Sequence, residues 1–239
     1  YLNENGKPKY KGIGLYKEYD YDAPHAAYAE KVWSIIGKGV LKDSRIPDID
    51  IVEATKGEAG VISYRVLDND KADLIHIRDI LFNKFQRADF KEQKDIFSIE
   101  DLIECIGMQI ENKENFINVK KQLLHTLLLD AITNNGDRHG NNWALIRDKK
   151  TNKYKLADFD HSSAFVDMFN AKEFYTVDGW VGSYITTNPN RKKFMMGACG
   201  DEIIEYISKN YRKEFEEFSI IFDQNLDSII KKIENEELD

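Results

Sequence analysis

The sequence predicts an α+β protein with two lobes: a small β-rich N-terminal lobe and a larger helical lobe after it. Runs rich in Val, Ile and Tyr, which are typical of strands, lie mainly in the first third of the chain. Apolar residues at helical spacing dominate from about residue 75 onward. A polar connector at residues 67–72 separates the two regions, so we expect lobes at residues 1–70 and 71–239 with a ligand-binding cleft between them.

The first lobe is expected to contain strands and one helix. Residues 13–20 read as a strand. A helix is predicted at 23–37, because Pro24 suits the first turn, apolar side chains share one face, and Gly37 can end it. Residues 48–54 and 60–67 flank the turn sequence TKGEAG, so we expect a hairpin.

Three helices stand out in the second lobe. The first, at 98–110, opens with Ser98 and Asp101 at capping-box spacing. The second, at 119–133, carries a wide apolar stripe of the kind that a central core helix needs, and we expect Gly136 to end it in the left-handed conformation. The last is expected at 213–233.

Composition narrows the class of protein. Of 239 residues, 42% are hydrophobic and 32% charged, and no run reaches the roughly 20 apolar residues of a membrane span. Only two cysteines are present and no secretory segment opens the sequence, so we expect a cytoplasmic protein without a disulfide framework. The net charge of −8 argues against direct nucleic-acid binding, and no membrane contact is expected.

A polar loop, NNGDRHGNN, follows the central helix. Asp137 lies five residues before Asn142, and the sequence then reads as strand, turn, strand. Such a hairpin returns Asp158 or Asp160 to the vicinity of Asn142. Amide and carboxylate oxygens are ligands that Mg²⁺ takes together with phosphate oxygens, and Asp137 could accept a proton from a hydroxyl. The Asp-to-Asn spacing is that of a protein-kinase catalytic loop.

The segments GDRHGNN and ADFDHSSAF resemble the catalytic loop and metal-binding segment of atypical kinases, which include the phosphatidylinositol kinases. The match is closest to the bacterial HipA-like and CtkA-like serine/threonine kinases, and its motifs cover residues 119–165. The resemblance implies a protein-kinase-like fold, ATP and Mg²⁺ as cofactors, Asp137 as catalytic base, and Asn142 and Asp160 as metal ligands. Asp158 remains an alternative to Asp160, because no glycine follows Asp158-Phe159.

The same resemblance suggests where the nucleotide binds. His139 would brace the loop or contact phosphate. Lys17, paired with Glu30 of the following helix, is the candidate for the lysine over the α- and β-phosphates, and Lys11 is the alternative. Backbone groups within residues 63–67, near Tyr64 and Val66, would bind adenine. No Gly-rich loop of the usual pattern is visible.

We therefore expect a serine/threonine protein kinase with a protein substrate and, as HipA-like proteins imply, an inhibitory antitoxin-type partner. The alternatives are a nucleotide-binding pseudokinase, a lipid kinase of the phosphatidylinositol type, and a metal-dependent hydrolase. Residues 166–200 are either an irregular packed connection or an activation or substrate-binding segment. The basic run at 191–193 is a solvated face or an anion contact.

Overall fold

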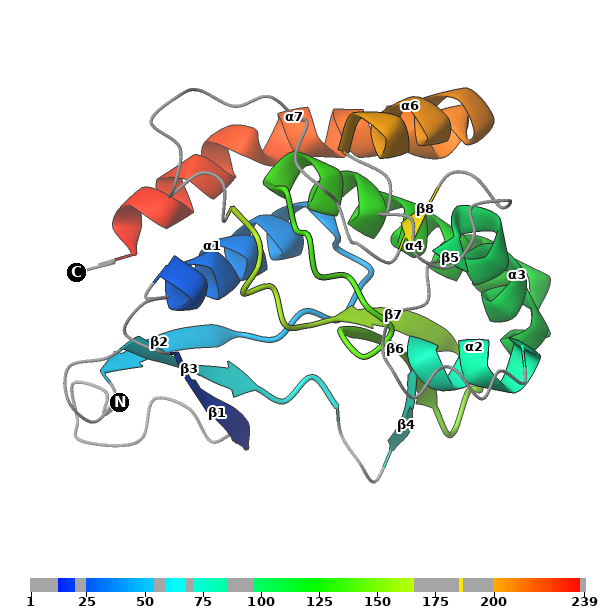
Figure 1. Ribbon diagram of the computed structural model, residues 1–239, viewed down its shortest axis with the longest axis horizontal. Coiled ribbons are helices and arrows are strands. Elements are labelled where there is room, and N and C mark those ends of the chain that lie inside the picture. The colour runs from blue at the N-terminus through cyan, green and yellow to red at the C-terminus, as the bar shows by residue number, and fades with distance from the viewer. Residues whose placement is uncertain are drawn as a thin grey trace.

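The computed structural model describes residues 13–19, 25–53, 59–67, 71–85, 97–165, 185–186 and 200–236. It confirms the predicted mixture of helices and strands. The longer strands form two separate three-stranded sheets, with orders β1-β3-β2 and β4-β6-β7. Helices α1, α4, α6 and α7 lie on one side of these sheets (Figure 1). No helix in the described ranges has the length and apolar character needed to cross a membrane.

The first sheet is antiparallel throughout. It is made of β1 (Gly14–Glu18), β2 (Ile49–Glu53) and β3 (Ala59–Tyr64). The pairing of β2 with β3 confirms the predicted hairpin, and β1 pairs with the other edge of β3, where Lys17 lies opposite Val61. Helix α1 (His25–Val40) packs against β2 and β3. This packing brings a strand lysine and a helix glutamate within reach of each other.

Helix α1 does not end at Gly37, as we expected, but continues to Val40. The glycine serves close packing instead. A Cβ atom at position 37 would lie 2.7 Å from the Trp33 ring and 2.8 Å from the end of the Ile46 side chain. Trp33 is fully buried, so the space that Gly37 leaves open is filled by the core.

The second sheet includes a strand that the sequence did not reveal. Its strands are β4 (Ala72–His76), β6 (Trp143–Asp148) and β7 (Tyr154–Asp158), all antiparallel. β4 follows the expected connector directly and leads into α2 (Ile77–Phe85), which was also not predicted. The β6–β7 hairpin was predicted, and its register pairs Trp143 with Asp158.

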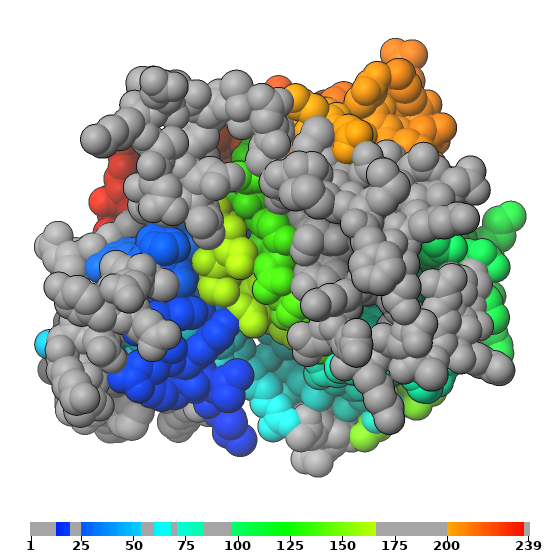
Figure 2. All heavy atoms as spheres, in the orientation of Figure 1, coloured from blue at the N-terminus to red at the C-terminus, as the bar shows by residue number. Residues whose placement is uncertain are grey.

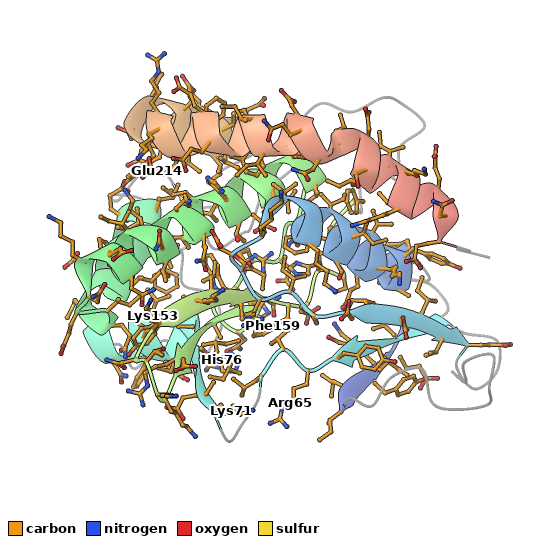
Figure 3. The ribbon with its side chains drawn as sticks, turned by 180° about the vertical axis from the view of Figure 1, so that it is seen from behind. Arg65, Lys71, His76, Lys153, Phe159 and Glu214 are labelled. Atoms are coloured by element: carbon orange, nitrogen blue, oxygen red, sulfur yellow. The ribbon has the colours of Figure 1, made fainter. Side chains whose placement is uncertain are left out.

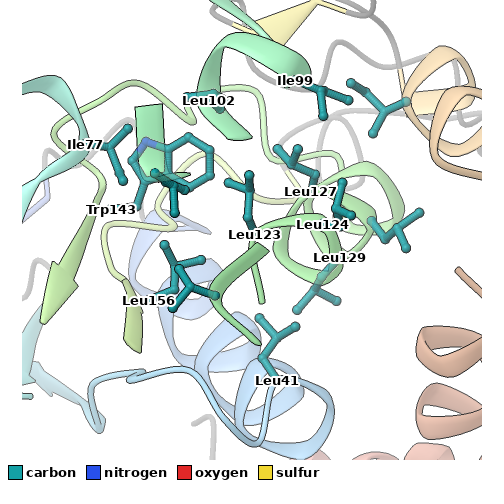
Figure 4. Packing of buried hydrophobic residues seen from close by; sticks show 14 of the residues in the cluster. Leu41, Ile77, Ile99, Leu102, Leu123, Leu124, Leu127, Leu129, Trp143 and Leu156 are labelled. Atoms are coloured by element: carbon teal, nitrogen blue, oxygen red, sulfur yellow. The ribbon is translucent and has the colours of Figure 1, made fainter. Parts of the chain in front are cut away.

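Helix α4 (Lys113–Thr133) is the centre of the hydrophobic core. It is buried on every side from residue 122 to residue 131, which explains its weak amphipathic pattern in that stretch. Its leucines pack among apolar side chains from α1, α2, α3 and the second sheet (Figure 4). The helix ends at Asn134, whose φ of 51° is left-handed, and not at Gly136 as we expected. A rigid helix therefore carries the loop that follows it.

The remaining helices cover the core. α3 (Ile99–Gln109) begins at the predicted capping box, in which Ser98 and Asp101 bond to each other's backbone N–H groups. α7 (Arg212–Asn235) extends the predicted helix at both ends, and α6 (Gly200–Asn210), which was not predicted, packs against α4 and α7. The short strands β5 (Phe97–Ser98) and β8 (Ile185–Thr186) pair in parallel.

Candidate active site

A cavity of about 770 Å³ brings together residues from distant parts of the sequence. Its walls come from β1, from α1 and the segment after it, from residues 63–67, from β4, and from the loops that precede β6 and follow β7. In Figure 2 the blue N-terminal elements and the yellow-green segment after β7 meet on one face of the molecule. The volume is typical of a site for a small-molecule ligand or cofactor.

Lys17 contacts two carboxylates in the wall of this cavity. Its Nζ lies 3.0 Å from Glu30 Oε1 and 2.5 Å from Asp160 Oδ1. Glu30 is only 3% exposed and also accepts a hydrogen bond from the Tyr19 hydroxyl. Burial opposes the charge on Lys17, but Glu30 and Asp160 outweigh it and raise the lysine pKa. The expected lysine–glutamate pair is thus formed, and Lys17 stays cationic at the cavity wall.

Asn142 and Asp160 meet at the cavity because of the β6–β7 hairpin. Phe159 N–H donates to the Asn142 carbonyl at 3.1 Å, so the residues next to the paired ends of both strands lie together. The Asn142 amide donates to the Asp137 carbonyl at 2.7 Å, and no described residue donates to Asn142 Oδ1. Lys17 and Ser162 bond to Asp160 Oδ1, which leaves Oδ2 open. One amide oxygen and one carboxylate oxygen therefore suit a hard cation such as Mg²⁺.

Asp158, the alternative metal ligand, lies elsewhere. Its side chain is fully buried and does not border the cavity. Thr126 donates to its Oδ2 at 3.0 Å, and its Oδ1 faces Arg138 at 3.9 Å. Burial raises the pKa of Asp158 to about 7, although Arg138 opposes this shift. Of the two aspartates, only Asp160 is positioned to reach a ligand in the cavity.

Asp137 and His139 occupy the loop after α4. Asp137 lies beside the cavity rather than on its wall, is 40% exposed, and has its Oδ2 3.5 Å from the Asn142 amide nitrogen. Burial and the charge of Asp160 raise the pKa of Asp137, whereas His139 lowers it. His139 borders the cavity, with Nε2 3.7 Å from Asp137 Oδ2. An acceptor hydroxyl that approached from outside the cavity could reach Asp137.

The predicted adenine segment lines the other end of the cavity. Tyr64 and Val66 both border it. The Tyr64 N–H already donates a hydrogen bond to the Asp48 carbonyl at 2.8 Å. The Val66 backbone N–H and C=O, in contrast, make no hydrogen bond to the described residues. Ile13 and Leu15, both at least 70% exposed, border the same cavity, which accounts for two large exposed apolar side chains. A flat apolar ring bound in this part of the cavity would cover the side chains of Ile13 and Leu15.

Arg138 holds the loop from behind, a role that the sequence motif did not reveal. It is fully buried and donates two hydrogen bonds of 2.7 Å to Asp130 of α4. It also donates to the Asn142 carbonyl at 2.9 Å and to His161 Nδ1 at 3.1 Å. A single buried guanidinium thus connects the core helix to the residues on both sides of the candidate metal site.

Trp33 of α1 and His161 connect this helix to the segment that carries Asp160. Their rings stack with centroids 3.3 Å apart and an interplanar angle of 10°. Burial and the charge of Arg138 lower the His161 pKa well below its usual value. His161 directly follows Asp160, which has a left-handed φ of 58°. Nothing in the sequence indicates that Trp33 stacks on a residue of the segment that follows β7.

The structure brings the predicted site residues into one region, apart from the buried Asp158. Lys17, Glu30, Tyr64, Val66, His139, Asn142 and Asp160 all border the cavity. Sequence reasoning missed the contacts of the buried residues Arg138 and Trp33, neither of which borders the cavity. It also missed His76 and Phe159, which do border it. Lys11, most of segment 166–200 and the basic run 191–193 lie outside the described residues.

Comparisons with known proteins agree with this architecture. No family model and no curated protein matches the sequence. Among solved structures, the Helicobacter pylori proinflammatory kinase CtkA matches with a TM-score of 0.57 and 14% identity over 94% of this chain and 87% of CtkA. HipA of the Shewanella oneidensis MR-1 toxin–antitoxin system, solved with HipB and operator DNA, matches with a TM-score of 0.58 and 14% identity over 92% of this chain.

The chain spans about half of HipA, 51% of its length. At 14% identity these matches establish a shared fold and not a shared activity. The resemblance predicted from GDRHGNN and ADFDHSSAF is therefore confirmed at the level of structure. This protein has the fold of the kinase CtkA and of the toxin–antitoxin protein HipA.

Proposed function

We propose that this protein is an ATP- and Mg²⁺-dependent phosphotransferase, most specifically a serine/threonine protein kinase. The observation that carries the proposal is the convergence of Lys17, Asn142 and Asp160 on one cavity, with Asp137 beside Asn142. A cation, two hard oxygen ligands and a carboxylate near the acceptor side are the groups that phosphoryl transfer needs from a protein. The fold shared with the kinase CtkA supports the same conclusion.

Each group has a defined part in the proposed reaction. Lys17, kept charged by Glu30, would bind the α- and β-phosphates once nucleotide displaces its contact with Asp160. Asn142 and Asp160 would hold Mg²⁺, which supplies charge neutralisation at the phosphates. Asp137 would accept the proton of the incoming hydroxyl. Its pKa, raised by burial, suits a base more than an unperturbed aspartate does.

The test is phosphate transfer from labelled ATP to a mixture of Ser/Thr peptides in the presence of Mg²⁺. Asp137→Asn should lower transfer by about 10²- to 10⁴-fold, as expected for loss of a general base. The matched control is Asp227→Asn, the same change at an exposed position on α7, which should transfer label like the unmodified protein. Removal of Mg²⁺ by a chelator should abolish transfer.

Other outcomes would identify the alternatives. Thermal stabilisation by ATP without any transfer would indicate a nucleotide-binding pseudokinase. Label in phosphatidylinositol vesicles but not in peptides would indicate a lipid kinase, and release of free phosphate without an acceptor would indicate a hydrolase. Loss of transfer in both Asp137→Asn and Asp227→Asn would contradict the role given to Asp137.

An antitoxin-type partner is also part of the proposal. HipA belongs to a toxin–antitoxin system and was solved with HipB. We propose that a partner protein of the antitoxin type likewise binds this chain and inhibits it. The test is growth arrest on expression of this protein, relieved by co-expression of a cognate inhibitor and absent for Asp137→Asn. Growth arrest that persists with Asp137→Asn would contradict a toxic activity based on phosphotransfer.

A further inference from the structure

One side chain in the cavity wall has no part in the phosphotransfer scheme. His76 is the last residue of β4, and it borders the cavity together with Leu74, two positions earlier on the same face of the strand. Its ring meets the ring of Phe159 edge to face, with centroids 5.8 Å apart (Figure 3). This contact fixes the imidazole against the segment that leads to Asp160.

The two ring nitrogens of His76 lie in different surroundings. Nδ1 is shielded from solvent and has no hydrogen-bond partner within the described part of the chain. Nε2 is not among the described side-chain atoms that are both buried and without a partner, and the residue borders the cavity, so Nε2 is the ring nitrogen available to a ligand there. A buried N–H without an acceptor is unfavourable, so the neutral tautomer that carries its proton on Nε2 is preferred. His76 then presents one hydrogen-bond donor to a ligand.

The direction of β4 places this donor between the two ends of the cavity. The strand starts just after the residue 63–67 segment and leads into α2, where Arg78 N–H donates to the Gly140 carbonyl at 2.9 Å. Two strand residues span about 6.6 Å. Leu74 therefore lies nearer the predicted adenine segment. His76 lies further along the strand, about 6.6 Å nearer than Leu74 to the loop that carries His139 and Asn142.

We infer that His76 recognises a ribose hydroxyl of the bound nucleotide. The inference rests on the proposed function, in which the base lies at Val66 and the phosphates at Lys17. The sugar joins these two parts, so it crosses the middle of the cavity wall, where His76 offers its Nε2–H to a hydroxyl oxygen. His76 is then a specificity residue that distinguishes ribonucleotides from deoxyribonucleotides.

The test is calorimetric titration of the full chain with Mg²⁺ and ATP, 2′-deoxy-ATP or 3′-deoxy-ATP. One neutral hydrogen bond corresponds to an affinity ratio of about 2- to 13-fold. The unmodified protein should prefer ATP over at least one deoxy analogue by that ratio. His76→Phe keeps an aromatic ring against Phe159 but removes the donor, so it should bind ATP as weakly as that analogue. His76→Gln, which retains an N–H donor, should restore part of the preference.

Leu74→Ala is the matched control on the same strand face. It should weaken ATP and both analogues by the same factor and leave their ratio unchanged, because Leu74 contributes only apolar contact. Equal affinities in the unmodified protein, or an unchanged preference in a folded His76→Phe variant, would overturn the inference. A folded protein that binds no ATP would instead refute the proposed function, so the two failures are distinguishable.

Discussion

The buried ion pair of Arg138 and Asp130 gives a quantitative test of how the site is held in place. Neither side chain is exposed, and Asp130 accepts two bonds of 2.7 Å from the guanidinium. Asp130→Leu would leave the charge of Arg138 without its main partner. Removal of one member of a buried pair destabilises a protein by about 3 to 5 kcal/mol. We expect about 3 kcal/mol, near the lower limit, because Asp158 still faces Arg138 at 3.9 Å.

A double variant separates stability from activity. In Asp130→Leu/Arg138→Met both charges are replaced by apolar groups, so most of the lost stability should return. Phosphotransfer should not return, because the Asn142 carbonyl and the His161 ring have lost the donor that holds them. Urea denaturation measures the free energy of unfolding, and the single variant should also melt about 6 to 12 °C lower.

Two results would refute this reasoning. One is a loss below about 1 kcal/mol in Asp130→Leu, which would mean that the guanidinium is not an uncompensated buried charge in the variant. The other is a double variant that is as unstable as the single one but fully active. That result would show that Arg138 supports the fold and does not position Asn142 and His161.

Three further predictions follow from particular contacts. Burial lowers the pKa of His125, so the contribution of this residue to stability is complete above about pH 6.5 and is lost as the pH falls from there toward the folded pKa. In urea denaturation curves between about pH 5 and 7.5, His125→Asn should therefore reduce the loss of stability on the acid side. An unchanged loss in the variant would exclude His125 as its source. Ser98→Ala should destabilise the fold by about 1 kcal/mol by removing the side-chain cap of α3, and an unchanged denaturation midpoint would contradict the cap. Gly140→Ala should destabilise the fold by about 1 to 3 kcal/mol and lower phosphotransfer, because the added Cβ would lie 2.9 Å from the Arg78 backbone. The control is Gly107→Ala, whose Cβ would meet only a side-chain ring at 3.3 Å and which should keep its activity.

Much of the site could be read from the sequence because its spacing is local. The five-residue step from Asp137 to Asn142 lies in one loop, and a short hairpin necessarily returns Asp160 near Asn142. The strand that carries Lys17 directly precedes the helix that carries Glu30, so their pairing also follows from nearby elements. Where the sequence misjudged a boundary, as at Gly37, the glycine does not end α1 but lies packed between Trp33 of the same helix and Ile46, which follows the helix in the chain.

By itself, the sequence determined the mixed helix-and-strand class, the longest helices and the residue types that we propose for a phosphotransfer site, because periodicity and motif spacing act over short distances. Only the tertiary structure decided that Asp160 and not Asp158 reaches the cavity, that Arg138 ties α4 to the loop, and that His76 joins the wall. β4 finds its partner in β6, about 70 residues later, and that pairing leaves no local pattern. Burial and long-range contact assign such roles, because identical side chains acquire different functions according to what surrounds them.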